Sequence, residues 1–171
     1  MVTRNGVHIS IMSGKLQGLK AISTNTVTNP FCNKMHTSSN SNGDEICPEC
    51  YSHAMLATYR KNAQAALQWN SDYLSSKLWH EDAFPVIMER VFRFSAHGEL
   101  INDTHLLNLL TIVRKNPKTT FALWTKRKDI VGKVFKVEAK PANLVMIFSN
   151  NKIGAILAKP PKHFDKTFNN V

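Results

Sequence analysis

Long hydrophobic runs are missing from this chain of 171 residues, and so is any strong bias in glycine or proline. No stretch of about 18 consecutive apolar residues occurs, so we expect no membrane-spanning helix. The N-terminal segment lacks the apolar block and cleavage site of a secretory signal, which predicts a cytoplasmic protein. Seven glycines, seven prolines and 43% hydrophobic residues exclude collagen, a coiled coil and a wholly disordered chain. The length suits one folded domain whose core needs no disulfide bonds.

Acidic residues are scarce, and most of the imbalance lies in one part of the chain. The sequence holds 22 Lys and Arg against 12 Asp and Glu, which gives a net charge of +10. Residues 101–171 contain 13 of these basic residues and only four of the acidic ones. A basic half of this kind is typical of proteins that bind nucleic acid or another polyanion. The alternative is an ordinary solvated surface rich in lysine.

Cysteine is absent from the last 121 residues, yet Cys32, Cys47 and Cys50 lie within 19 residues of one another. An odd number of cysteines in a reducing compartment argues against a disulfide framework. Clustered thiols in that setting indicate a metal centre. Cys47 and Cys50 flank Pro48 and Glu49 at the predicted start of a helix, where free N–H groups and the helix dipole favour thiolate.

The chemistry of these donors leaves three interpretations open. Three thiolates would hold a 4Fe-4S cluster and leave one iron without a protein ligand. Zinc would need a fourth ligand, which His36 or His53 would supply. His53 follows Cys50 by three residues and would share one side of its helix. Structural or redox thiols without a metal are the third interpretation, and the residues favour the iron–sulfur cluster.

Short apolar strands alternate with amphipathic helices along the rest of the chain. One or two strands are expected before the cysteines, a helix from Pro48 and another near 82–90. Three further strands, with helices between them, are expected over 91–96, 119–125 and 143–149. Such alternation is typical of βαβ units with parallel strands and right-handed crossovers. The strands are too few for a closed eight-stranded barrel, so we predict an α/β fold, a partial (open) parallel β/α barrel.

The domain organisation follows from the same reading. Residues 1–151 are predicted as the partial barrel, with the cysteines on a loop over residues 32–50. Residues 152–171 are basic and contain proline, which predicts a C-terminal arm.

Polar residues follow each of the three later predicted strands. These residues are His97-Gly98-Glu99, Thr125-Lys126-Arg127 and Ser149-Asn150-Asn151. Ligands collect at the carboxyl ends of parallel strands, so we expect these side chains to face one cleft. The alternative is that loops are polar in any case, and that Glu99 only caps a helix that begins near residue 102.

Four sequence blocks occur in a fixed order: NPFC with CPECYSHAM, then RFSAHGEL, NPKTTFALWTKRKDIV and KPANLVMIFSNN. Over about residues 15–151 they resemble the phage gene product 88 family. That family has a Cys…CxxCY motif, an R-x-x-x-x-G-[DE] strand end and a P-x-x-x-F-x-x-[WY]-TK strand. It resembles in turn the radical S-adenosylmethionine (SAM) superfamily, whose partial barrels hold a 4Fe-4S cluster on three cysteines. The resemblance implies a shortened barrel of radical-SAM type.

The resemblance also implies roles for single residues. Cys32, Cys47 and Cys50 match the cluster ligands. Gly98 and Glu99 match the pair that binds the amino group of SAM, since a carboxylate there pairs with an ammonium. The remaining residues implied to bind the cofactor or a substrate are Tyr51, which follows the last cysteine, and Lys126 and Ser149 at the later strand ends. His97 is a further candidate beside Gly98.

Two functions follow from these observations. The first is a phage-encoded 4Fe-4S protein of the host cytoplasm that is radical-SAM-like, with the enzymatic activity and the substrate left open. The second is a non-enzymatic basic protein stabilised by zinc or a cluster. On that reading residues 101–171 bind nucleic acid or a host complex in host takeover or counter-defence. Glu99 separates the two, because SAM binding requires its carboxylate and polyanion binding does not.

Overall fold

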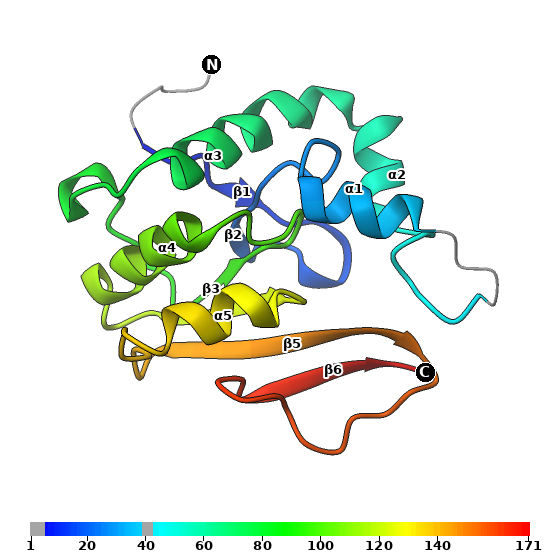
Figure 1. The fold of residues 1–171 in the computed structure, drawn as a ribbon. Helices are drawn as coiled ribbons and strands as arrows, with labels where there is room; N and C mark the ends of the chain where they lie inside the picture. Colours follow the sequence, from blue (N-terminus) through cyan, green and yellow to red (C-terminus); the bar gives the residue numbers. More distant parts are fainter. Residues whose placement is uncertain (1–5, 39–42) are drawn as a thin grey trace.

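The computed structural model describes residues 6–38 and 43–171, which form helices around one six-stranded sheet (Figure 1). The strands lie side by side in chain order: β1 (Ser10–Ile11), β2 (Lys20–Ile22), β3 (Val91–Phe94), β4 (Thr120–Thr125), β5 (Leu144–Ile153) and β6 (Lys166–Asn170). β1 is antiparallel to β2, and every other neighbouring pair is parallel. Within the described residues the sheet is therefore open, with β1 and β6 as its two edges.

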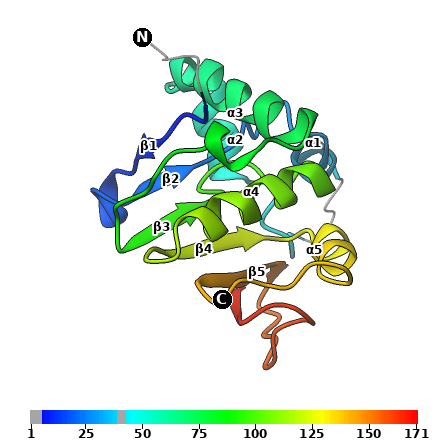
Figure 2. The ribbon, with the colours of Figure 1, turned by 90° about the vertical axis from the view of Figure 1, so that its left-hand side faces the viewer.

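The described residues form five α-helices between the strands: α1 (Pro30–Thr37), α2 (Tyr51–Ala57), α3 (Gln64–Ser76), α4 (Asp103–Lys115) and α5 (Lys128–Val134). Helices α3, α4 and α5 lie next to one another on one face of the sheet (Figures 1 and 2). Right-handed crossovers between strands that follow each other in one direction bring all the connecting helices to the same face.

The main core fills the space between that face and the helices. Phe92, Phe94 and Phe121 are fully buried there, and their ring centroids lie 5.1–5.9 Å apart. Helix α4 contributes a continuous apolar face, which consists of Leu106, Leu109, Leu110, Ile112 and Val113. Because side chains alternate along a strand, the residues between these phenylalanines point to the other face.

That other face of the sheet is only partly covered. It carries Val91, which is 50% exposed, and the half-buried Arg93, Trp124 and Ser149. These side chains are therefore available to line a cavity at the carboxyl ends of the strands.

The structure confirms a mixed α/β fold with a mostly parallel sheet. The predicted strands over 91–96, 119–125 and 143–149 appear as β3, β4 and β5, and β1 and β2 precede the cysteines. The C-terminal segment differs from the expected arm, because its last residues add β6 to the sheet, parallel to β5. Phe164, in the loop before β6, is buried against Phe148.

The helix predicted near 82–90 is wrong. Only a short 3-10 turn forms, over Glu81–Ala83, and the chain then runs extended to β3. Side chains of neighbouring segments satisfy its backbone, since the N–H of Ile87 donates to Asn116 and the carbonyl of Ile87 accepts from Thr119. Tertiary hydrogen bonds have replaced the helical ones that the local pattern suggested.

Candidate functional site

A cavity of about 170 Å³ lies at the carboxyl ends of β3 and β4, where it also meets β5, α1 and the start of α2. Eight of the nine single residues proposed for the site line it: Cys32, Cys47, Cys50, His97, Gly98, Glu99, Lys126 and Ser149. The structure thus brings together residues that lie up to 117 positions apart in the sequence. What they bind remains a prediction.

Cys32 lies in the first turn of α1. Asn29 caps this helix, and its side-chain oxygen accepts a hydrogen bond from the Cys32 N–H at 3.1 Å. The amide group of the same Asn29 donates to the backbone carbonyl of Glu99 at 2.9 Å. One buried asparagine therefore fixes the first cysteine relative to the turn after β3.

Cys47 and Cys50 flank a turn rather than lying in the helix. The N–H of Cys50 donates to the carbonyl of Cys47 at 3.2 Å, and Cys50 is the N-cap residue of α2. The sequence predicted that Pro48 would begin the helix. In the structure Pro48 lies in the turn that precedes α2. Both residues line the cavity together with Cys32.

Burial favours the neutral thiol form of Cys32 and Cys47. It raises the pKa of Cys47 to about 11, although Lys126 acts in the opposite direction. Burial also raises the pKa of Cys32, and the nearby carboxylate of Glu99 raises it further. The sequence predicted that the helix dipole would favour thiolates, but burial outweighs that effect at Cys32 and Cys47. A metal that binds these thiols would therefore displace their protons.

The described residues contain no group of three or more His, Cys, Asp or Glu side chains arranged to hold one metal ion. Zinc bound to thiolates at about 2.3 Å would need sulfurs about 4 Å apart. His36 and His53, the alternative zinc ligands, stack on each other with 3.8 Å between ring centroids. Nδ1 of His36 lies 3.3 Å from the carbonyl oxygen of Cys47, and neither histidine is among the residues that line the cavity.

Glu99 joins the ends of two strands. Its carboxylate accepts hydrogen bonds from the hydroxyl of Thr125 and from the N–H of Lys126, at 3.1 Å to each oxygen for the latter. Burial raises its pKa, while Lys126 and these hydrogen bonds lower it. Helix α4 is capped instead by Asn102, whose side chain accepts from the N–H of His105. The alternative role of Glu99 as a cap for that helix is therefore wrong.

Gly98 brings this turn against the end of β2. Its φ is +74°, and a Cβ atom there would lie 2.2 Å from Oγ1 of Thr24 and 2.7 Å from the Thr24 carbonyl oxygen. The N–H of Gly98 donates to the hydroxyl of Thr26 at 2.9 Å. Only glycine permits this approach, which places Glu99 beside the strand ends.

Two other candidates have different surroundings. The ammonium of Lys126 donates to the hydroxyl of Ser149 at 3.0 Å, so the two lie together as expected. Tyr51 does not line the cysteine cavity. It is 70% exposed, its hydroxyl lies 3.0 Å from that of Tyr59, and it borders a neighbouring cavity of about 280 Å³. His97 borders both cavities and contacts the hydroxyl of Ser52 through Nδ1 at 2.8 Å.

Comparison with known proteins places the chain in a family. Residues 19–170 match the family described as Gene product 88. The chain belongs to this family of phage proteins. No curated protein and no solved structure matches it. None of the described helices is long and apolar enough to cross a bilayer.

The R-x-x-x-x-G-[DE] pattern on which the resemblance to this family rests begins at Arg93, a residue that was not among those predicted for the site. Arg93 and Trp124 both line the cysteine cavity, and the guanidinium carbon lies 4.5 Å from the centre of the Trp124 ring. Thr26 lines it as well, from the segment after β2. Two features of the sequence pointed to Arg93: it begins the R-x-x-x-x-G-[DE] pattern, and it alternates with the buried Phe92 and Phe94 along β3. Only the structure shows that the face on which it lies borders the cavity.

Proposed function

We propose that this protein holds a 4Fe-4S cluster on Cys32, Cys47 and Cys50 and binds SAM beside it, in a radical-SAM-like arrangement. The observation that carries the proposal is the cavity itself. It gathers the three thiols with Glu99 and Lys126, although 14 residues separate the first two cysteines. The reducing cytoplasm of the host would keep these thiols available.

The arrangement of the thiols favours a cluster over a single ion. All three line one cavity, and no group of side chains among the described residues is arranged to hold a single metal ion. In a cluster each thiolate binds a different iron, so the sulfurs lie further apart than around one zinc ion. Lys126 is the positive group that acts on Cys32 and Cys47, and its charge would offset part of the negative charge of the thiolates.

Glu99 and Lys126 complement the amino-acid end of SAM. When bound, a cluster on three thiolates supplies one-electron chemistry and leaves one iron open to a further ligand. Thr125 and the Lys126 N–H hold the carboxylate of Glu99 in place, and its other lone pairs remain able to accept from an ammonium. The ammonium of Lys126 donates to the neutral hydroxyl of Ser149, and an ammonium in this position can also donate to a carboxylate.

Metal analysis after anaerobic reconstitution tests the cluster. We expect about four irons and a matching amount of sulfide per chain, with a broad visible absorption band. Cys47→Ala should lose the iron, whereas the control Ser149→Ala, in the same cavity, should keep it. Stoichiometric zinc without iron, or unchanged iron in Cys47→Ala, would overturn the proposal.

Calorimetric titration of the reconstituted protein tests SAM binding. Glu99→Gln should weaken it about 10- to 100-fold, because a charge-assisted hydrogen bond contributes about 1.5–3 kcal/mol. Glutamine keeps an acceptor for the Lys126 N–H, so iron content should not change. Equal affinity of both proteins for SAM would remove Glu99 from the binding site.

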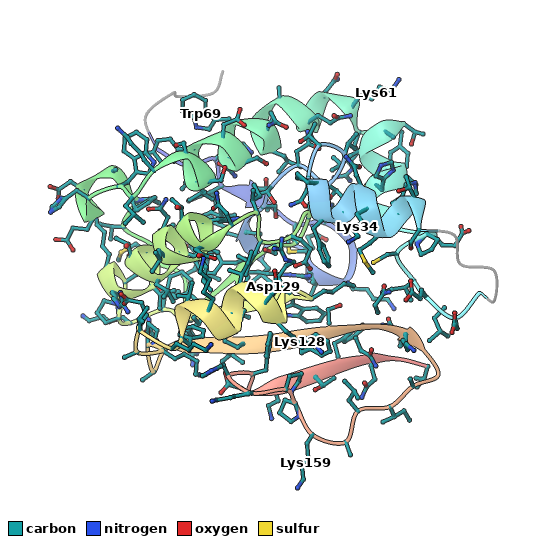
Figure 3. All side chains as sticks on the ribbon, viewed as in Figure 1. Lys34, Lys61, Trp69, Lys128, Asp129 and Lys159 are labelled. Carbon is teal, nitrogen blue, oxygen red and sulfur yellow. The ribbon has the colours of Figure 1, made fainter. Side chains whose placement is uncertain are left out.

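A second candidate function, nucleic-acid binding, is favoured by one surface feature. Helix α5 and the loop before β6 border a shallow depression of about 370 Å³ with Lys128, Lys133, Lys136, Lys162 and His163. Lys133 pairs with Asp103, and Asp129 in the same depression pairs with Arg127. The described residues offer no ion pair to the other three lysines. Figure 3 marks Lys128 and Asp129 on α5, and Lys159 pointing outward from the same loop.

Charge reversal tests this surface. Binding of a fluorescent single-stranded oligonucleotide should weaken in Lys128→Glu combined with Lys136→Glu, and its salt dependence should become shallower by about one charge per lysine. The control Lys61→Glu, beside α2, should behave like the wild-type protein. Binding that does not respond to salt, or that survives the double reversal, would exclude this depression as the interface.

A further inference from the structure

Arg93 lies on the open face of the sheet, where its neighbours on the adjacent strands have small side chains. Phe92 and Phe94 point into the helix-covered core, so Arg93 points the opposite way, into the cysteine cavity. Its partners in register on the two neighbouring strands are Ala21 and Ala122. These small side chains leave space around the guanidinium at this level of the sheet.

The guanidinium of Arg93 has no acidic partner in the described part of the chain. Its Nε atom is buried without a hydrogen-bond partner. Glu99 is the one carboxylate among the residues that line the cavity, and its hydrogen bonds go to Thr125 and Lys126. The face of Trp124 stabilises the cation in part. A half-buried cation that has no ion-pair partner is stabilised when an anion reaches it.

Arg93 and Lys126, the two basic side chains that line the cavity, act on different groups. Lys126, not Arg93, is the basic group that acts on Cys32 and Cys47. Arg93 acts instead on His97, whose pKa is lowered by burial first and by this charge second. Arg93 and Lys126 therefore act on different side chains of the same cavity.

We infer that the open face of the sheet binds a substrate through an oxyanion, a carboxylate or a phosphate, held by the guanidinium of Arg93 above the ring of Trp124. A planar guanidinium donates two parallel hydrogen bonds to either group. Trp124, which contacts the ring of Phe168 at 5.0 Å, supplies a flat apolar surface for the rest of the molecule. That the bound anion is a substrate rests on the proposed function. The anion site itself can be tested on protein that holds no cluster.

Titrations of the apo protein with inorganic phosphate and with benzoate test the site. Wild-type protein should bind one of the two, and the stronger ligand identifies phosphate or carboxylate as the preferred group. Arg93→Met should weaken that binding at least tenfold, and Arg93→Lys, which keeps the charge but not the planar fork, should weaken it less. The control Arg60→Met, in the neighbouring cavity, should leave it unchanged.

The outcomes separate this inference from the proposed function. Weaker anion binding by folded Arg93→Met, with the wild-type iron content after reconstitution, supports the site. The site also stands if no cluster forms on the wild-type protein but phosphate or benzoate still depends on Arg93. Equal anion binding by wild type and Arg93→Met, no binding of either probe by wild type, or a loss of iron alone in Arg93→Met overturns the inference. The last result would make Arg93 a counter-ion of the cluster.

Discussion

Replacing Gly98 by alanine would test whether the turn that carries Glu99 is built against the end of β2. The new Cβ would lie 2.7 Å from the carbonyl oxygen of Thr24 and 2.2 Å from its hydroxyl. The backbone of Thr24 cannot withdraw freely, because its N–H donates to the carbonyl of His97 at 3.1 Å. The residue would also have to keep a φ of +74°.

The expected loss of stability follows from two contributions. A left-handed conformation costs a residue other than glycine about 1–2 kcal/mol. Overpacking against fixed neighbours costs about 1–3 kcal/mol more. The free energy of unfolding, measured by urea titration with circular dichroism, should therefore fall by about 2–5 kcal/mol. The control Gly132→Ala, in α5 with no atom within 4 Å of the new Cβ, should instead raise it by about 0.5–1 kcal/mol.

A double variant identifies which contact matters. Thr24→Ala removes the hydroxyl but leaves the carbonyl oxygen, so in combination with Gly98→Ala it should recover only part of the lost stability. Full recovery would show that the backbone approach is unimportant. A loss below about 1 kcal/mol for Gly98→Ala alone would refute the argument that this turn requires glycine.

Two further predictions concern buried polar groups. Burial lowers the pKa of His105 to about 3, below the usual 6.5, so as pH falls the unfolded chain takes up the proton first. Stability should then decrease between pH 6.5 and 3 by up to about 1.4 kcal/mol per pH unit, and urea titrations should show a shallower decrease in His105→Asn. A pH dependence shared by both proteins would contradict this. The side chain of Asn108 is fully buried. It donates to the carbonyls of Leu74 and Lys77 and accepts from the backbone N–H of Trp79. Asn108→Ala should cost about 2–4 kcal/mol in the same assay, and a loss under 1 kcal/mol would show that water replaces the amide.

The local sequence pattern was sufficient to predict the strands and helices whose apolar residues recur at a regular spacing. The apolar runs at β3, β4 and β5 and the leucine face of α4 are periodic, so each predicted its own element from neighbouring residues. Failure came where distant side chains outweigh local preference. The segment after Ala83 has helical spacing, yet Asn116 and Thr119 take its hydrogen bonds and hold it extended.

The composition of the candidate site was also readable from the sequence, because residues at strand ends converge in any parallel sheet. Glu99 and Lys126 could be selected in this way, and Cys32 from its closeness in sequence to Cys47 and Cys50. The order of the four motifs pointed to the phage family that the comparison then showed. The position of Tyr51 could not be read, because adjacency to Cys50 says nothing about which side of a turn a side chain takes.

Tertiary structure alone decided how the site is held and what faces it. Asn29 links the first cysteine to Glu99, Gly98 packs on Thr24, and Arg93, on an open sheet face, has no acidic partner among the residues that the structure describes. Each of these facts depends on which strands are neighbours and on the space between them. Periodicity specifies the direction of a side chain within its own element, whereas burial, pairing and the absence of a partner are properties of the assembled sheet.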